Sequence, residues 1–142
     1  MNVIYVVAAL ITDPAGRMLT VRKRDTQMFM NPGGKPEVGE SAVQALCREL
    51  AEEVGLEVSA QDLTFIDTYT VKAANEPGFD VCAEVFRLGP DVGEHTIGAE
   101  IVESRWIDPH VPGNTPLAAL AADHMLPILV MSDPSATRKR LN

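Results

Sequence analysis

The segment from Gly34 to Leu56 constrains this chain more than any other part, and it reads GKPEVGESAVQALCRELAEEVGL. A glycine opens it, a helix-like run rich in acidic residues fills its middle, and a glycine followed by a leucine closes it. Nine positions of defined type fall in one fixed frame. The probability of a chance match in a chain this short is on the order of 10⁻⁸. The function is therefore inferred from this segment first.

The middle of the segment has the pattern of an amphipathic helix. Ser41 is a good N-cap, and Gly55 suits the left-handed position just after a helix C-terminus. The apolar residues between them recur at helical spacing, which predicts one stripe facing a core. These residues are Val43, Leu46, Cys47, Leu50 and Val54.

The opposite face of this predicted helix is acidic. Glu49, Glu52 and Glu53 stand at i, i+3 and i+4, so their carboxylates converge. Like charges at that spacing repel, and carboxylates in the last turns oppose the helix dipole. Arg48, one turn before Glu52, offsets only part of this cost. An exposed acidic face is the alternative, but a cluster that costs stability without a packing benefit indicates a functional site.

The turn before the helix adds a second feature. Three carboxylates on a rigid helix suit a divalent cation such as Mg²⁺ or Mn²⁺, which commonly bridges protein carboxylates and substrate phosphates. In the turn, Gly33 and Gly34 permit close approach of the backbone, and Lys35 supplies a positive charge beside a helix N-terminus. Together the turn and the helix predict a site for a metal ion and a phosphate chain.

The whole segment resembles the Nudix box, G-x5-E-x7-R-E-U-x-E-E-x-G-U with U aliphatic, and matches it at every defined position. The upstream residues Pro32 to Lys35 and the downstream Trp106 are similar to the usual surroundings of this box. The flanking match extends loosely over about the whole chain, whereas only the box is specific. The resemblance implies an α/β fold, a Nudix-type α/β/α sandwich with a mixed central sheet. It also implies metal-dependent hydrolysis of nucleoside diphosphates linked to another group, X.

Length and composition agree with one compact domain, since the chain has 142 residues of which 46% are hydrophobic. We expect this domain to cover residues 1–131 and residues 132–142 to form a flexible basic tail. The apolar run Val3 to Ile11 lacks a basic n-region and is read as a strand and not as a signal peptide. Cys47 and Cys82 are expected to be buried thiols in a reducing cytoplasm.

The net charge and the apolar pattern restrict the partners. A formal charge of −8 disfavours polymeric nucleic acid, whereas a small nucleotide with bound metal ions remains compatible. No stretch is long enough to span a membrane. The expected partner is a small nucleotide-type substrate, and either a monomer or a homodimer is compatible with the sequence.

The remaining sequence predicts strands with a second helix near the end. Val3–Thr12 and Met18–Lys23 are expected to form a hairpin around the Asp13–Gly16 turn, and residues 24–40 a loop. Thr115 and Pro116 are expected to start the second helix, which runs toward Met125 and is bent or stopped by Pro127. The other predicted strands are Leu63–Val71, Phe79–Leu88 and Glu103–Ile107.

The resemblance also implies roles for residues of the box. Glu49, Glu52 and Glu53 are expected to bind Mg²⁺ or Mn²⁺, together with the backbone carbonyl of Gly33. The general base is expected to be Glu53 or Glu49. Arg48 is expected to orient a glutamate through an ion pair. The expected catalytic set is therefore Glu53, Glu49, Glu52 and Arg48.

Residues outside the helix complete the predicted site, each with a plain structural alternative. Glu100 and Glu103 are candidates for a further metal ligand or base, or else belong to a solvated turn and strand. Phe29 either lies near the substrate base or anchors the loop in the core, and Asp123 either reads a purine edge or is an exposed helical residue. The candidates for holding phosphates, which are otherwise surface charges, are Lys35, Arg22 and Arg24.

The substrate class follows by elimination. The proline that ADP-ribose hydrolases tend to carry about sixteen residues after Gly55 is replaced by Val71, and Tyr69 comes too early for a dinucleoside polyphosphate hydrolase. A MutT-like (d)NTP pyrophosphohydrolase is therefore favoured. The alternatives are a hydrolase of ADP-ribose or a nucleotide sugar, a non-catalytic nucleotide sensor, and an isomerase of the isopentenyl diphosphate type. The isomerase would need a cysteine in the site, whereas Cys47 lies on the apolar stripe.

Overall fold

The computed structural model describes residues 2–73 and 76–132. The predicted basic tail, with its Arg138–Arg140 cluster, lies outside these residues apart from Ser132. None of the helices in the described ranges is long and apolar enough to cross a membrane.

In chain order the elements are β1 (Val3–Ile11), β2 (Met18–Lys23), β3 (Gly33–Gly34), α1 (Ala42–Val54), η1 (Ala60–Asp62), β4 (Thr64–Lys72), β5 (Asp80–Leu88), β6 (Ile101–Ile107), η2 (Leu120–Met125) and α2 (Leu126–Ser132).

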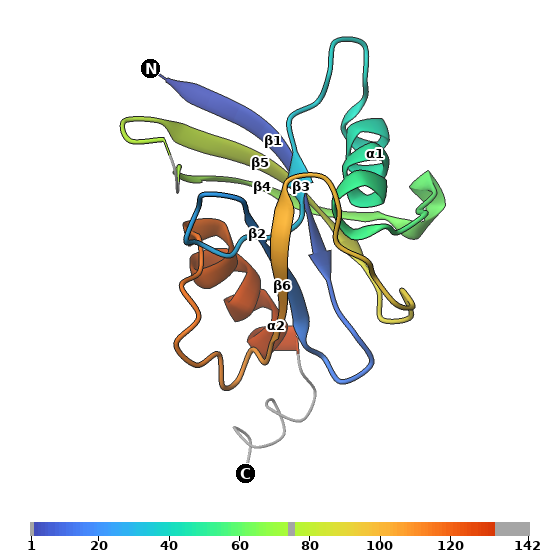
Figure 1. Cartoon of the computed structure of the whole chain (residues 1–142), viewed down its shortest axis with the longest axis vertical. Helices are drawn as coiled ribbons and strands as arrows, with labels where there is room; N and C mark the ends of the chain where they lie inside the picture. The colour runs from blue at the N-terminus through green and yellow to red at the C-terminus, as the bar shows by residue number, and fades with distance from the viewer. Residues whose placement is uncertain (1, 74–75, 133–142) are drawn as a thin grey trace.

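The main sheet has four strands in the order β3-β1-β5-β4 (Figure 1). Strand β1 runs parallel to β5, whereas β3 is antiparallel to β1 and β4 is antiparallel to β5. The sheet is therefore mixed, as predicted. Strands β2 and β6 form a separate two-stranded antiparallel sheet.

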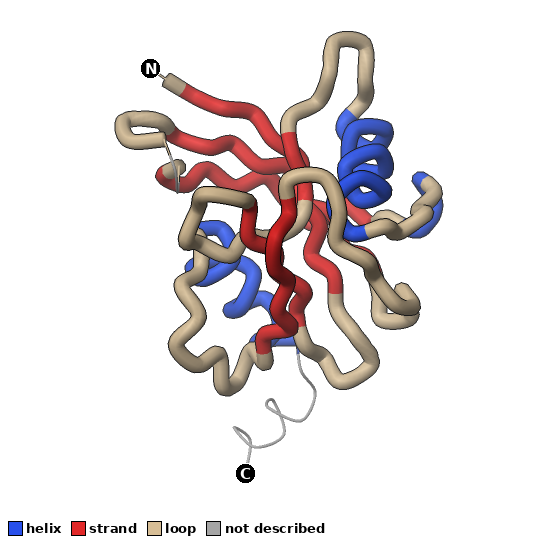
Figure 2. Tube along the Cα trace, in the orientation of Figure 1, coloured by secondary structure: helices blue, strands red, loops and turns tan. Residues whose placement is uncertain are grey.

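Strand β1 is apolar on both faces and connects the two halves of the core. Its residues Val7, Ala9 and Ile11 pack in a cluster with the buried side chains of α1. Ala8 and Leu10 point the other way and pack with buried side chains of η2 and α2. Because alternate residues of a strand face opposite sides, the helices cover opposite faces of the sheet (Figures 1 and 2). The α/β sandwich predicted from the sequence is confirmed.

The predicted hairpin of the first two strands is wrong. The turn at Asp13–Gly16 is present, with the Gly16 N–H donating to the Asp13 carbonyl at 2.9 Å. Beyond it the backbone pairing consists of a single bridge between Thr12 and Met18, because β1 pairs with β3 and β5 whereas β2 pairs with β6. A strand buried on both faces belongs in the middle of a covered sheet, so long-range pairing with β5 prevails over the local hairpin.

The predicted start of the second helix is also wrong. Thr115 does not cap a helix; its hydroxyl accepts a hydrogen bond from Arg105 Nη1 at 3.2 Å. The carbonyl of Pro116 accepts the N–H of Phe29 at 2.8 Å, so this segment runs alongside the loop before β3. Backbone pairing with that loop delays the helix, and η2 begins only at Leu120.

Pro127 does not stop the second helix, because it lies in the first turn of α2. The preceding η2 is a π-helix in which the N–H of Leu126 donates to the carbonyl of Ala121. A proline lacks the N–H that an α-helix interior requires. The change from π to α hydrogen bonding just before Pro127 lets the chain continue as a helix past this residue.

Candidate active site at the end of helix α1

Helix α1 is fixed at both ends by the residues that the sequence singled out. The Ser41 hydroxyl accepts the N–H of Gln44 at 3.1 Å, and the Gln44 side chain accepts the N–H of Ser41 at 2.9 Å. At the other end Gly55 adopts a left-handed conformation with a φ of 65°, and its N–H donates to the Leu50 carbonyl. The acidic residues of the last two turns are therefore held in fixed positions.

The two glycines before the helix form β3, a short strand inside the predicted loop. Gly33 pairs with Ala8 of β1, and a Cβ at Gly33 would collide with the Val7 carbonyl oxygen. A Cβ at Gly34 would lie between 2.5 and 2.8 Å from the carboxylate atoms of Glu49. The glycines thus allow the backbone to lie directly between the central sheet and the acidic face of α1.

A cavity of about 630 Å³ opens beside this strand and the end of α1. Carboxylates and positively charged side chains both line it, which suits a ligand that carries negative charge together with a cation. The acidic lining residues are Glu37, Glu49, Glu52, Glu53, Glu76 and Glu100, and the basic lining residues are Lys23, Arg24, Lys35, Arg48 and Lys72.

Glu53 is the most buried of these carboxylates, with an exposed fraction of 4%. Its Oε1 accepts the N–H of Gly33 at 3.0 Å. Burial raises the pKa of Glu53 to about 7; the charges of Glu49 and Glu100 act in the same direction, and the Gly33 N–H and Lys23 act against them. A carboxyl group that titrates near neutral pH inside a cavity is a candidate for proton transfer or cation binding.

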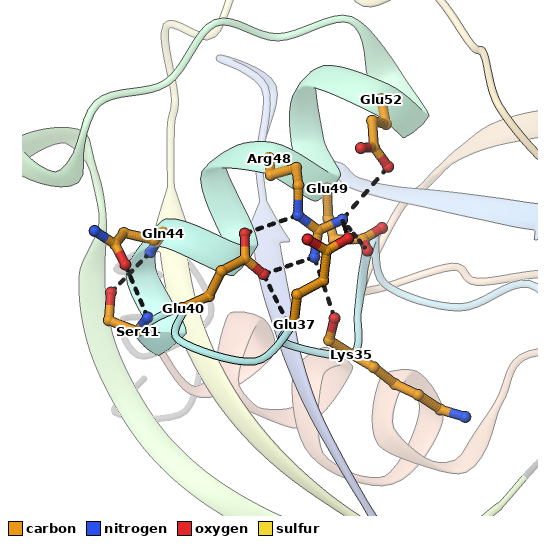
Figure 3. Close-up of polar contacts among 8 residues, drawn as sticks. All are labelled: Lys35, Glu37, Glu40, Ser41, Gln44, Arg48, Glu49 and Glu52. Carbon is orange, nitrogen blue, oxygen red and sulfur yellow. Dashed lines mark hydrogen bonds and ion pairs between the residues drawn. The ribbon is translucent and has the colours of Figure 1, made fainter.

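Arg48 connects the turn to the acidic face (Figure 3). Its Nε and Nη2 donate to the Glu40 carboxylate at 2.8 and 2.9 Å, and its Nη1 donates to Glu49 at 2.9 Å. The guanidinium also lies 3.5 Å from a carboxylate oxygen of Glu52, and its Nη2 donates to the Lys35 carbonyl at 3.2 Å. Arg48 therefore links the loop to the helix and orients Glu49.

Arg48 pairs with Glu40 and Glu49, but the pKa values of these two glutamates are shifted in opposite directions. The hydrogen bond from Arg48, aided by the N–H of Glu37, lowers the pKa of Glu40 to about 2. Burial raises the pKa of Glu49 although Arg48 opposes it, with the charge of Glu52 adding to the rise. Glu40, which lies outside the cavity, is thus held charged, whereas the charged form is disfavoured at the partly buried Glu49, which lines the cavity.

The structure brings most of the predicted site together. Glu100, Arg24, Lys35 and Gly33 line the same cavity as the three glutamates of the helix and Arg48. The N–H of Arg24 donates to the Glu100 carbonyl at 2.9 Å, which ties the end of β2 to the segment before β6. These residues come from four separate parts of the chain.

Three predicted residues lie together outside the cavity. Arg22 Nε donates to Glu103 at 3.2 Å, and burial is outweighed by the hydrogen bonds from Arg22 and Arg105, so the pKa of Glu103 is lowered. Phe29 is 2% exposed, with the guanidinium carbons of Arg22 and Arg105 at 6.0 and 4.7 Å from its ring centroid. This placement corresponds to the loop-anchor alternative for Phe29. Glu103 and Arg22 form an ion pair between β2 and β6.

Asp123 lies away from the cavity on the exposed side of η2. It lines a separate, shallow pocket together with Tyr69 and His124, whose rings lie 4.7 Å apart between centroids. Its placement corresponds to the alternative of an exposed helical residue.

Lys23 and Asn31 line the cavity but are not among the residues predicted from the sequence. Alternation along a strand places Arg22 and Arg24 on one face and Lys23 on the other. The pairing of β2 with β6 shifts between Arg22 and Lys23, and beyond this irregularity both Lys23 and Arg24 line the cavity. An asparagine before Pro-Gly has the signature of a turn residue, so the sequence alone gives no signal that Asn31 lines the cavity.

The donor set fits a divalent metal ion in its chemistry. The carboxylates of Glu49, Glu52, Glu53 and Glu100 supply hard oxygen ligands, and the raised pKa of Glu53 is a cost that a nearby cation would relieve. Within the described ranges no three His, Cys, Asp or Glu side chains already form a ligand cluster. Arg48 pairs with Glu49 and Glu52, both of which already line the cavity.

The family of the chain follows from the match of the NUDIX domain to residues 3–128. The chain belongs to the NUDIX family, as the box predicted. A curated MutT-like protein of Streptomyces ambofaciens is 29% identical over 103 residues, which are 72% of this chain and 62% of that protein. This chain therefore spans less than two thirds of that relative.

Solved structures share the fold over nearly the whole chain. The E. coli ORF135 protein is 25% identical with a TM-score of 0.70, and the match covers 96% of each chain. The E. coli dihydroneopterin triphosphate pyrophosphohydrolase is 23% identical with a TM-score of 0.73, covering 90% of this chain and 96% of that chain. The second likeness concerns the fold alone.

Proposed function

We propose that this protein is a Nudix hydrolase that uses Mg²⁺ or Mn²⁺ to cleave a diphosphate linkage in a nucleoside diphosphate linked to X. A (d)NTP, cleaved to a nucleoside monophosphate and pyrophosphate, is the favoured substrate class. The observation that carries the proposal is the cavity in which carboxylates of α1 and Glu100 face basic side chains from β2 and the Gly33–Lys35 turn. Family membership and the similarity to a MutT-like protein support it.

The roles of the residues follow from their positions. Lys35, Arg24 and Lys23 bind phosphate oxygens, because they supply positive charge on the cavity wall. Glu49, Glu52, Glu53 and the Gly33 carbonyl would hold the metal ion, with Glu100 as a further ligand. When bound, that ion neutralises phosphate charge and lowers the pKa of an attacking water.

Proton transfer is assigned to Glu53 or Glu49. The proton of the attacking water passes to a carboxylate within hydrogen-bond reach, and a pKa near the working pH favours this exchange. In the metal-free protein the pKa of Glu53 is about 7, and burial also raises the pKa of Glu49, so both residues remain candidates. Arg48 keeps Glu49 oriented and does not contact substrate.

The test is a release assay for phosphate and pyrophosphate on a panel of (d)NTPs, oxidised dGTP, nucleotide sugars, ADP-ribose and dinucleotides. Each compound is assayed with Mg²⁺, with Mn²⁺ and with EDTA. Metal-dependent turnover of one class supports the proposal and identifies X. Turnover of ADP-ribose or a nucleotide sugar in place of a (d)NTP would move the substrate assignment to that class.

The second candidate function is a nucleotide sensor without catalytic activity. It is favoured if no compound of the panel is turned over while one of them still raises the melting temperature. The intact box weighs against it, since every defined position of the motif is present.

A further inference from the structure

Asn31 is one of the residues that line the cavity, and its side-chain oxygen is buried without a hydrogen-bond partner. The residue is 6% exposed, and among the described residues its Oδ1 is the one buried side-chain nitrogen or oxygen without a hydrogen bond. The other end of the amide is occupied, because Nδ2 donates to the sulfur of Met18 at 3.4 Å. Buried polar side-chain atoms are nearly always paired, so this oxygen requires an explanation.

The orientation of the amide follows from its neighbour. A thioether sulfur accepts hydrogen bonds weakly and donates none. The NH₂ group therefore faces Met18, and the carbonyl oxygen is left as the free end. A group that satisfies this oxygen must be a hydrogen-bond donor.

Asn31 belongs to the apolar wall of the cavity. Met18 is part of the buried cluster beneath η2 and α2, and the cavity-lining residues Val6, Val81 and Leu120 pack against the same cluster. No aromatic side chain is among the described residues that line the cavity. A flat heterocycle would thus lie against aliphatic side chains without aromatic stacking, and its orientation would depend on polar contacts such as the one from Asn31.

We propose that Asn31 determines specificity by accepting, through Oδ1, a hydrogen bond from an N–H group on the nucleobase of the substrate. This inference rests on the proposed function, because it takes the phosphates to lie at the carboxylate wall and the base at the apolar wall. An acceptor selects ligands that carry a donor, since the oxygen remains unpaired with ligands that lack one.

The folded protein alone gives no reason for an asparagine here. An unpaired buried acceptor lowers stability, whereas a leucine of similar size would pack against the apolar wall. Asn31→Leu is therefore expected to keep or raise the melting temperature while it abolishes selectivity. A purely structural asparagine would give the opposite result, with a lowered melting temperature and unchanged selectivity.

The experiment compares nucleotides with analogues that lack base N–H donors. Purine riboside triphosphate replaces ATP and GTP, and zebularine triphosphate replaces CTP and UTP, in ribo or deoxyribo form. For the base that the wild type prefers, loss of the donor is expected to lower kcat/KM by about 5- to 100-fold, mainly through KM. In Asn31→Leu, and in Asn31→Ala as a second variant, the nucleotide and its analogue are expected to be cleaved equally well.

Thr20→Val is the matched control. Thr20 is fully buried, and its hydroxyl is already satisfied by the Arg105 carbonyl at 2.9 Å. This variant is expected to lose stability and to keep the wild-type preference. The proposal is overturned if the wild type does not distinguish the nucleotide from its analogue, or if both Asn31 variants distinguish them as the wild type does.

The failure of this inference is distinguishable from the failure of the proposed function. If the wild type cleaves the nucleotides and the Asn31 variants keep its preference for the nucleotide over the analogue, the proposed hydrolase function is supported and the proposed role of Asn31 is wrong. If the wild type cleaves none of them, the assignment of (d)NTPs as the substrate class is wrong. Calorimetric binding of the same nucleotide and analogue pairs to wild type and Asn31→Leu then decides the role of Asn31.

Discussion

The two ends of helix α1 shift the pKa values of glutamates in opposite directions. At the N-terminal junction, Glu40 accepts two hydrogen bonds from Arg48 and one from a backbone N–H, and its pKa falls to about 2. At the C-terminal end, Glu53 is buried with one backbone N–H, and its pKa rises to about 7. Both residues are fixed positions of the same motif. The environment therefore divides them into a structural carboxylate and a reactive one.

The two glutamates differ in how well their negative charge is compensated. The Glu40–Arg48 pair joins the turn to the helix and satisfies both charges at the surface. The buried Glu53 has no positively charged side chain bonded to it in the described structure, and Arg48 is engaged by Glu40, Glu49 and Glu52. A bound cation would remove this imbalance, which is why the comparison is best tested at Glu53 first.

The largest effect is expected for Glu53→Gln on turnover. An amide neither accepts the proton nor binds metal as a carboxylate does, so kcat is expected to fall by about 10²- to 10⁴-fold. Steady-state assays with saturating Mg²⁺ measure this. Glu57→Gln, an exposed residue just past the box, is the control and keeps wild-type turnover. Full activity of Glu53→Gln would remove the acidic face of α1 from the proposed mechanism.

The same variant is expected to be more stable than the wild type in metal-free buffer. The pKa of Glu53 is raised from 4.5 to about 7, so folding disfavours the charged form. The resulting loss of stability is absent below pH 4.5, grows between pH 4.5 and 7, and is complete above pH 7. At pH 8, Glu53→Gln should gain about 3 kcal/mol, whereas near pH 4 the two proteins should be equal. Urea unfolding in the presence of EDTA at both pH values measures this difference in unfolding free energy. A gain in stability that does not depend on pH would contradict the argument from the burial of Glu53.

A smaller effect is expected for Gly34→Ala, which tests how closely the turn must approach the acidic face. The new methyl group would meet the Glu49 carboxylate at 2.5 to 2.8 Å, and that flexible side chain can move aside. Stability should change by less than about 1 kcal/mol. Displacement of Glu49 should lower kcat/KM by about 10-fold or more. Thermal unfolding measures the change in stability, and steady-state kinetics measure the change in kcat/KM. A variant with unchanged kinetics would show that the position of Glu49 is not critical for turnover.

The neighbouring glycine supplies the contrast for this prediction. At Gly33 the methyl group would meet backbone atoms of β1, which cannot move aside, and the φ of 155° is unfavourable for other residues. Gly33→Ala is therefore expected to destabilise the fold itself. Equal losses of stability in the two variants would mean that the side chain of Glu49 is as rigid as the backbone of β1.

Local patterns predicted helix α1 well. Ser41 and Gly55 cap it as expected. Of the predicted apolar stripe, Leu46, Leu50 and Val54 are buried, whereas Val43 and Cys47 are only partly buried. Ala45 and Glu53 are buried in addition. The signals that were misread depend on distant partners. The pairing of β1 with β5 cannot be seen in a sequence where the first two strands are joined by a good turn. The delayed start of η2 depends on backbone pairing with Phe29.

The site was predictable to the same extent. The glutamates of the box and Arg48 are on one helix, so their convergence follows from spacing. Lys23 depends on an irregularity in the pairing of β2, and Asn31 depends on which atoms surround its amide. Neither property is encoded in a short window of sequence. Residues of this kind are found only when the whole fold is known.

The smallest effect is expected for Glu40→Gln, which tests the satisfied end of the helix. The folded-state pKa of about 2 lies below the ordinary value of 4.5, so the ionised carboxylate stabilises the fold. This contribution is present above pH 4.5 and is lost as the pH falls toward 2. The difference in unfolding free energy between wild type and Glu40→Gln should therefore be constant from pH 8 to pH 5 and shrink by pH 3, because groups common to both proteins cancel. A difference that stays the same at pH 3 would mean that the Arg48 pair contributes through shape and not through charge. Turnover should change far less than in Glu53→Gln, because Glu40 lies outside the cavity.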